Sequence, residues 1–318
     1  MYFAVNPTSP TLPAQIAQEI ESLRTQHEDA PFHVIALVDG AFDEQFFKSY
    51  PRSRWPRHSL YANTSLQSLG AAAPQLSTFS GQFDGIANWL ENLFSECSGK
   101  PMLSIIASAL DAGSLQRHFI PYIACRTEDT VEWPVRWGDT RVLPALMDSL
   151  NPVQREHMLS PIYCWWSQRR QGNELNWLGA GSVSPIASEF DKFPMDEATF
   201  AALLELSEPD SILNSIYDNQ PDILRNHDPV HAYVTVSRHL KIASAHHIEA
   251  ASARHHFSVL SLILWDDFTE HPAMAEILSR VSRGSEYFEE ISNLPSNFWE
   301  AAEEYHSSPQ TNKEKGFS

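Results

Sequence analysis

The segment VRWGDTRVLP, residues 135–144, places three charged side chains inside an otherwise apolar stretch. Charges in a buried segment need partners, because an ion that leaves water loses its hydration. Asp139 and Arg141 lie two residues apart and can pair with each other or with neighbouring basic residues, while Val142 and Leu143 begin an apolar helical stripe. The segment predicts a strand that stops at a charged corner and turns into a helix. A structural ion-pair network is the favoured use of such a corner, and catalysis is the alternative.

Two further apolar runs predict buried strands. Residues 32–38 form a continuous apolar run that ends in Asp39-Gly40, which suits a central strand. Residues 102–110 form a second run, and the amphipathic segment 83–94 before it indicates a helix. Strand, helix and strand in this order imply a mixed sheet covered by helices. Shorter patterns predict a helix at 14–26, a hairpin of 122–125 with 131–137, and a helix from Asn151-Pro152 to Leu159.

The second half of the chain is predicted to be helical. Asp196-Glu197 gives an acidic helix start, and Ser207-Glu208-Pro209-Asp210 indicates a fresh one. Further helices are expected at 229–245, 250–266 and 273–282. We therefore predict an α/β (α+β) N-terminal lobe with a mixed sheet at residues 1–185, an all-helical lobe at 186–306 and a disordered tail at 307–318.

Composition and charge indicate which classes of partner the protein is expected to bind. The 318 residues carry 22 Lys and Arg against 40 Asp and Glu, a net charge of -18 that repels phosphate backbones and anionic lipids. Neither nucleic acid nor a membrane is an expected partner. We find no export signal in the first residues and no run of 18 apolar residues, and Cys97, Cys125 and Cys164 are typical of reduced, buried thiols. The expected location is the cytoplasm.

A search for catalytic and metal-binding motifs gives no positive assignment. The segment Gly179-Ala180-Gly181-Ser182 fits neither a nucleophile elbow nor a dinucleotide fingerprint, and it is predicted to be a loop. The chain has no phosphate-binding loop of the G-x-x-x-x-G-K-S/T type and no H-E-x-x-H pair. Five histidines crowd one helical stretch without metal-ligand spacing: His239, His246, His247, His255 and His256. We predict no catalytic residue, no cofactor and no metal.

Two other clusters leave alternatives open. Asp39, Asp43 and Glu44 follow the first strand and could form an acidic site at a sheet edge, but a turn whose Asp side chains cap the next helix is favoured. Trp165-Trp166 could form a ligand shelf, and buried packing is the favoured interpretation.

The chain resembles the bacterial type VI secretion effector-adaptor family in six short blocks across residues 32–166. These blocks occur in the family's order and spacing: Val38-Asp39-Gly40-Ala41-Phe42, Ser59-Leu60-Tyr61, Ala73-Pro74-Gln75-Leu76, Arg117-His118-Phe119, residues 136–144, and Ser160-Pro161-Ile162. The resemblance implies an adaptor, called Tap or TEC, that is not an enzyme. Such adaptors bind a toxic effector in the cytoplasm and help load it onto the spike protein VgrG.

The resemblance also implies roles for individual residues. The family's aspartate and arginine of its aromatic-Asp-Pro-Arg-Val-Leu block fall on Asp139 and Arg141, and its Arg-His pair falls on Arg117 and His118. Thr140 stands where a Pro is usual and Ser160 where a Gly is usual, so the chain departs at two turns. The expected structural or partner-binding residues are Asp39, Phe42, Tyr61, Arg117, His118, Arg136, Asp139, Arg141, Pro161 and Trp165.

We therefore expect an adaptor whose partners are a secreted effector and the VgrG spike. In this hypothesis, Arg117, Arg136, Asp139 and Arg141 hold the N-terminal lobe in shape, and a groove between the lobes or on the helical lobe captures an effector's N-terminal segment. Two alternatives come from other classes. One is a hydrolase or transferase that uses Asp39, Asp43, His118 or Asp139 around a cleft. The other is an immunity-type inhibitor of a basic toxin.

Overall fold

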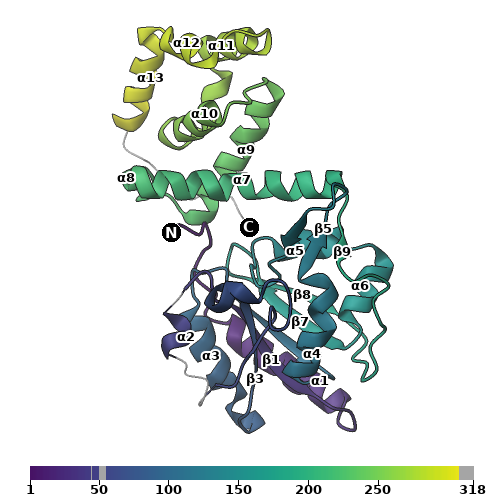
Figure 1. The fold of residues 1–318 in the computed structure, drawn as a ribbon. Helices are drawn as coiled ribbons and strands as arrows, with labels where there is room; N and C mark the ends of the chain where they lie inside the picture. Colours follow the sequence, from purple (N-terminus) through teal and green to yellow (C-terminus); the bar gives the residue numbers. More distant parts are fainter. Residues whose placement is uncertain (44, 50–54, 308–318) are drawn as a thin grey trace. The chain divides into compact units, whose positions relative to one another are not determined.

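A computed structural model describes residues 1–43, 45–49 and 55–307 of the chain (Figure 1). The chain divides into two compact units. We call Val5–Ser207 the α/β unit, and Met1–Ala4 together with Glu208–Ser318 the helical unit. The division falls after Ser207 and not after residue 185 as predicted, because β9 (Phe193–Pro194) pairs with β5 (Ala124–Arg126) and Phe193 is buried in the α/β core. The tail was predicted at 307–318, but Ser307 is the last residue of the last described helix, and residues 308–318 lie outside the described residues.

The main sheet of the α/β unit has six strands, and every pairing in it is antiparallel. Their order is β2 (His58–Ser59), β3 (Pro74–Thr78), β1 (His33–Asp39), β4 (Leu103–Ser108), β7 (Ile162–Gln168) and β8 (Glu174–Leu178). The predicted apolar runs at 32–38 and 102–110 are confirmed as the central strands β1 and β4. The fold class is confirmed, but the mixed sheet is the smaller, three-stranded one.

The smaller sheet has the order β6 (Glu132–Pro134), β5, β9. The pair β5 and β6 is the predicted hairpin and is antiparallel, whereas β9 runs parallel to β5. The main sheet is antiparallel because the chain does not cross directly from β1 to β4. After β1, the chain first forms β3, which runs antiparallel beside β1 and places Leu76 opposite Leu37. Only then does the chain enter α3 (Ile86–Glu96).

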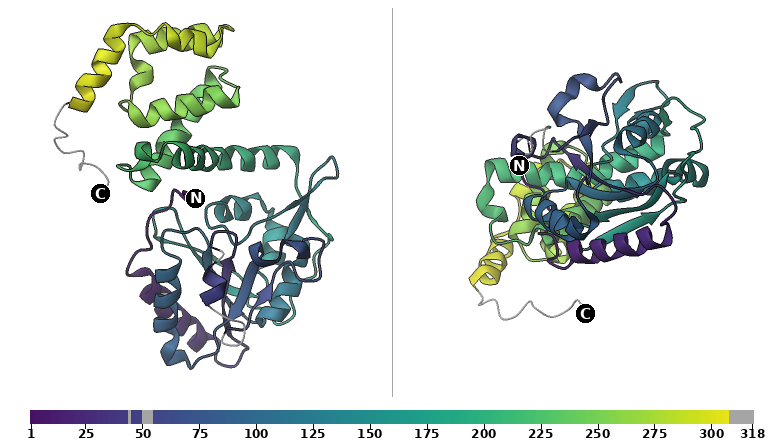
Figure 2. Two further views of the ribbon diagram at one scale, coloured as in Figure 1. Left: turned by 60° about the vertical axis from the view of Figure 1, so that its left-hand side comes forward. Right: turned by 90° about the horizontal axis from the view of Figure 1, so that it is seen from below.

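The two faces of the main sheet carry separate cores, because side chains alternate along a strand. Val34, Ala36 and Val38 of β1 face one core with α1 (Leu12–Gln26) and α3, which lie side by side (Figure 2). Ile35 and Leu37 face the other core, which also contains buried residues of three further helices. These are α4 (Ala112–Phe119), α5 (Leu143–Ser149) and α6 (Pro152–Leu159). The predicted helices at 14–26 and 152–159 are thereby confirmed, the second with a capping box between Asn151 and Gln154.

In its described residues, the helical unit consists of the end of α7 (Glu197–Asn219), the short 3-10 helix η4 (Phe268–Glu270) and six further α-helices. These are α8 (Pro221–Leu224), α9 (Pro229–Ala245), α10 (Ala251–Ile263), α11 (Pro272–Ser282), α12 (Tyr287–Ser292) and α13 (Ser296–Ser307). The predicted fresh start at 207–210 is wrong, since α7 continues through Pro209. A proline costs a helix one backbone hydrogen bond. The buried stripe of Ile212, Leu213 and Ile216 favours continuation, because it packs in one cluster with α9.

Residues 1–4 complete this helical cluster. Ala4 is buried in it, and the ring of Tyr2 lies against that of Tyr217 with centroids 5.8 Å apart. The backbone N–H of Tyr2 donates to Asn214 Oδ1 at 3.0 Å. Segments from opposite ends of the described chain thus fold into one unit.

Candidate functional site

The charged segment 136–141 meets the end of β1 and forms the corner that the sequence predicts. Asp139 and Arg141 form a bidentate ion pair: Arg141 Nε donates to Asp139 Oδ1 at 3.0 Å and Nη2 donates to Oδ2 at 2.8 Å. The backbone N–H of Arg141 also donates to Asp139 Oδ1. Both side chains are largely buried, at 6% and 13% exposure. Asp139 is thereby occupied as an acceptor on both oxygens.

A second ion pair joins the corner to β1. Arg136 Nη2 donates to Asp39 Oδ1, and the backbone N–H of Ala41 donates to the same oxygen at 3.1 Å. The ring of Phe42 lies under both arginines of the corner, with its centroid 5.5 Å from Cζ of Arg136 and 5.1 Å from Cζ of Arg141. The corner therefore links Asp39, Phe42, Arg136, Asp139 and Arg141 in one network of ion pairs and cation–π contacts.

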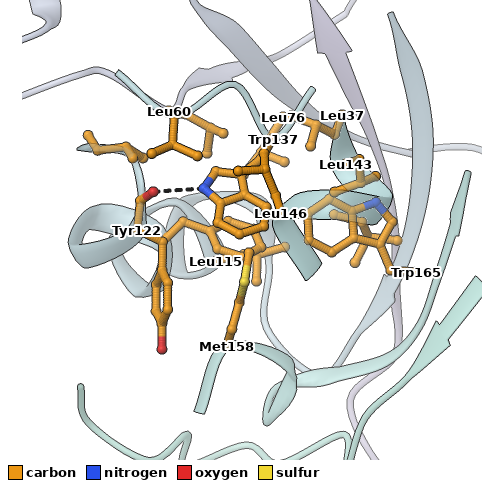
Figure 3. Close-up of a cluster of buried hydrophobic side chains, with 14 of the residues drawn as sticks. Leu37, Leu60, Leu76, Leu115, Tyr122, Trp137, Leu143, Leu146, Met158 and Trp165 are labelled. Carbon is orange, nitrogen blue, oxygen red and sulfur yellow. Dashed lines mark hydrogen bonds between the residues drawn. The ribbon is translucent and has the colours of Figure 1, made fainter. Parts of the chain in front are cut away.

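Close backbone packing fixes the geometry of this corner. A Cβ on Gly138 would lie 2.9 Å from Cβ of Asp39, so only a glycine lets the two segments approach this closely. The neighbouring Trp137 is fully buried, and its Nε1 donates to the carbonyl of Tyr122 at 2.7 Å (Figure 3). Thr140 donates its N–H to the carbonyl of Pro101 at 3.1 Å. A proline could not donate this bond, so the departure at Thr140 gives the corner a tether to the segment before β4.

Asp39 is a buried carboxylate of the corner whose pKa is raised. It is fully buried, and its Oδ2 has no hydrogen-bond partner among the described residues. Burial raises the pKa of Asp39 to about 6, against the lowering effect of Arg136. The nearby charge of Asp139 also raises it.

This shift predicts a pH dependence of stability. The folded chain holds more protons at Asp39 than the unfolded chain between pH 4 and 6, so this group stabilises the fold less as pH rises. We expect the difference in unfolding free energy between wild type and Asp39→Asn to fall by about 1 kcal/mol from pH 5.5 to 7.5. Urea titration at each pH measures it, and Asp148→Asn, at an exposed carboxylate, is the control. A difference that stays flat or rises with pH would mean that Arg136 dominates.

Three other predicted residues are structural. Trp165 is fully buried, and its Nε1 donates to Ser104 Oγ at 2.9 Å, so packing and not a ligand shelf is confirmed. The carbonyl of Pro161 accepts from the N–H of Ala109 at 2.9 Å and from Ser108 Oγ at 3.0 Å. Tyr61 is buried, and in the part of the chain that the structure describes its hydroxyl has no hydrogen-bond partner. Burial raises the pKa of Tyr61 to about 12.

The turn after β1 is also structural. Asp43 Oδ1 accepts from the N–H groups of Gln45 and Phe46, so it caps the short helix α2 (Phe46–Ser49) as predicted. Asp43 Oδ2 pairs with Lys100 Nζ at 2.5 Å. Glu44, the third acidic residue of this prediction, lies outside the described residues. Ser160 has φ of -53°, so the turn where the family has Gly needs no positive φ here.

Arg117 and His118 do not belong to the corner, which corrects the expectation that Arg117 helps to hold the lobe in shape. Arg117 is exposed on α4 and donates to Ser114 Oγ at 2.9 Å. His118 Nε2 is hydrogen-bonded to the carbonyl of Met158 at 3.0 Å, and burial lowers its pKa. The network of ion pairs and cation–π contacts at the corner therefore does not include Arg117 or His118.

Three of the clustered histidines of the helical unit have partners within the fold. His239 is fully buried, stacks on Phe268 with ring centroids 5.2 Å apart and contacts the carbonyl of Thr235 through Nδ1. His246 Nδ1 lies 2.8 Å from Ser282 Oγ, and His256 Nδ1 lies 2.9 Å from the hydroxyl of Tyr287. Within residues 1–43, 45–49 and 55–307, no three His, Cys, Asp or Glu side chains gather as a set of metal ligands.

Comparison with known proteins adds one finding. Residues 34–157 match a family described as Domain of unknown function (DUF4123). This match begins in β1, ends in α6 and includes the whole charged corner. No curated protein matches the chain, and no solved structure matches it. Among the helices that the structure describes, none combines the length and apolarity that crossing a bilayer requires.

One groove on the surface of the α/β unit was not predicted from the sequence. Residues 185–188 come from a loop that carried no motif, yet they line a groove of about 390 Å³ together with Arg117 and His118. Ile186 is a large apolar side chain that is exposed in this loop, and such a side chain is a weak sign of a binding surface.

Proposed function

We propose that this protein is a cytoplasmic type VI secretion adaptor, which binds a toxic effector and promotes its loading onto the VgrG spike. The observation that carries the proposal is the DUF4123 match at residues 34–157. It covers five of the six sequence blocks that resemble the effector-adaptor family, from Val38 to Pro144. The proposal extends that match from a domain of unknown function to a role in effector loading.

The chemistry of the charged corner supports a binding role over a catalytic one. Both oxygens of Asp139 accept from Arg141, and Asp43 accepts from Lys100 and from the N–H groups of Gln45 and Phe46. Asp39 is paired with Arg136 through Oδ1, and its Oδ2 accepts no bond from the described residues, but the side chain is fully buried and so out of a substrate's reach. His118 lies apart on α4, hydrogen-bonded to the backbone of Met158. A general acid or base needs a free site within reach of a substrate. The four residues that the enzyme hypothesis uses are thus better explained as parts of the fold.

Exposed apolar side chains on the α/β unit also support binding. Trp133 is 46% exposed and lies against Phe200, with ring centroids 5.4 Å apart. Ile186 is 45% exposed in the loop before β9. Tryptophan is enriched among the residues that dominate protein interfaces.

The test is a pull-down with a C-terminally tagged full-length chain from lysate of the native bacterium at moderate salt, followed by mass spectrometry. We expect the VgrG spike and a toxin to co-purify, and the tag alone is the control. Recovery of a toxin alone in a one-to-one complex would favour the immunity alternative. Recovery of no protein partner would overturn the adaptor and return attention to a small-molecule substrate.

A further inference from the structure

A groove on the α/β unit combines a cation with apolar walls. It has a volume of about 390 Å³ and is lined by α4, by the 3-10 turn η3 (Ile120–Tyr122) and by the loop 185–188. Leu110, Pro121, Tyr122, Pro185 and Ile186 supply the apolar lining, and Arg117 supplies the charge. A site of this size accommodates a few residues of an extended segment, whereas a whole domain face needs a broader surface.

Arg117 is held in place but not neutralised. Its Nη2 donates to Ser114 Oγ at 2.9 Å, and Ser114 in turn donates its N–H to Asp111 Oδ1 at 2.8 Å. No carboxylate in the described parts of the chain forms an ion pair with Arg117. Arg136 and Arg141, in contrast, are each paired with a buried aspartate. The guanidinium of Arg117 is therefore available to a ligand, and its planar fork suits a carboxylate.

Hydrogen bonds to the backbone fix two side chains that line the groove. The hydroxyl of Tyr122 donates to the carbonyl of Gln154 at 3.2 Å, and His118 Nε2 is hydrogen-bonded to the carbonyl of Met158. Burial lowers the pKa of His118, so this ring adds no charge at neutral pH. Arg117 is the positively charged side chain in a groove whose other lining residues are apolar or neutral.

We propose that this groove binds a short segment of the effector in which an Asp or Glu is flanked by apolar side chains. The carboxylate pairs with Arg117, and the apolar neighbours pack against Pro121, Pro185 and Ile186. Charge complementarity selects this occupant, because the chain as a whole has a net charge of -18 and would repel an acidic segment elsewhere on its surface. The assignment to the effector rests on the proposed function, while the chemistry of the segment rests on the groove alone.

The chemistry is tested with the purified full-length chain and a phage-displayed library of random 12-residue peptides. We expect the selected peptides to carry an Asp or Glu beside apolar residues, and Arg117→Glu to bind them at least tenfold more weakly. Arg117→Lys should fall between, because it keeps the charge and loses the fork. Selected peptides without an acidic residue, or peptides that bind Arg117→Glu as well as wild type, would overturn the assignment.

The identity of the occupant is tested by pull-down of the same variants. Arg225→Glu is the matched control, since Arg225 is 73% exposed, lies in the helical unit and undergoes the same change of charge. We expect Arg117→Glu to recover at least tenfold less effector with the spike unchanged, and Arg225→Glu to recover both. Loss of the spike alone, or no loss, would overturn the effector as occupant. If the wild type recovers neither the effector nor the spike, but the binding of acidic peptides still depends on Arg117, the groove is a binding site and the proposed adaptor function is wrong.

Discussion

Asp139→Ala is expected to lower the free energy of unfolding by about 3–5 kcal/mol. The variant removes the bidentate contact of Asp139 with the guanidinium of Arg141, a side chain that is only 13% exposed. It also removes the acceptor of the Arg141 N–H, which shapes the turn into α5. Denaturant unfolding followed by tryptophan fluorescence measures the loss, because seven of the nine tryptophans lie in the α/β unit.

The matched control is Asp148→Ala. Asp148 also pairs with an arginine, Arg155, at 3.3 Å, but its side chain is 79% exposed. Exposed ion pairs contribute at most about 1 kcal/mol, so this variant should unfold almost as wild type does. Equal losses in the two variants would refute a structural role for the buried corner.

Trp137→Ala is expected to cost a similar amount, about 3–5 kcal/mol, through a different mechanism. The indole is fully buried among Leu115, Leu146 and Met158, as Figure 3 shows, and its removal leaves a cavity at the base of the corner. It also leaves the carbonyl of Tyr122 without its indole donor. The same fluorescence-detected unfolding reports the loss.

Two further variants test whether the stability loss of Trp137→Ala comes from the buried cavity or would follow from truncating any large side chain. Trp137→Phe should recover part of the stability, since it refills much of the cavity but cannot donate to Tyr122. Leu178→Ala removes a side chain that is 71% exposed and should change the unfolding free energy by less than about 0.5 kcal/mol. A loss for Leu178→Ala as large as that for Trp137→Ala would contradict the cavity explanation.

The central strands and most helices were predictable because their patterns are local. A mostly apolar run such as 32–38 suits a strand covered on both faces, and β1 is covered by two cores. Helix starts at Asn151 and Pro229 also rely on nearby residues, and both helices begin as predicted. The Asp139–Arg141 pair was predictable for the same reason, since its members lie two residues apart.

Features that depend on distant segments were not predictable from patterns. The antiparallel sheet depends on β3, whose pairing with β1 joins Leu76 to Leu37 across 39 residues. The ion pair of Arg136 with Asp39 spans 97 residues. Pro209 signals a helix start locally, and packing of α7 against α9 overrides that signal. The groove at Arg117 needs the loop 185–188, which is remote in sequence and has no motif.

The packing of residues 1–4 against the helices of the helical unit has a consequence for folding during synthesis on the ribosome. Tyr2 and Ala4 need Asn214, Leu213 and Ile216, which are made only after the whole α/β unit. At about 5–20 residues per second, residues 5–207 take roughly 10 to 40 s to translate. Through that interval residues 1–4 are without their native neighbours, and at its end the α/β unit has the residues of both its cores. Translation order therefore favours an α/β unit that folds first and a helical unit that closes only when its two distant parts meet.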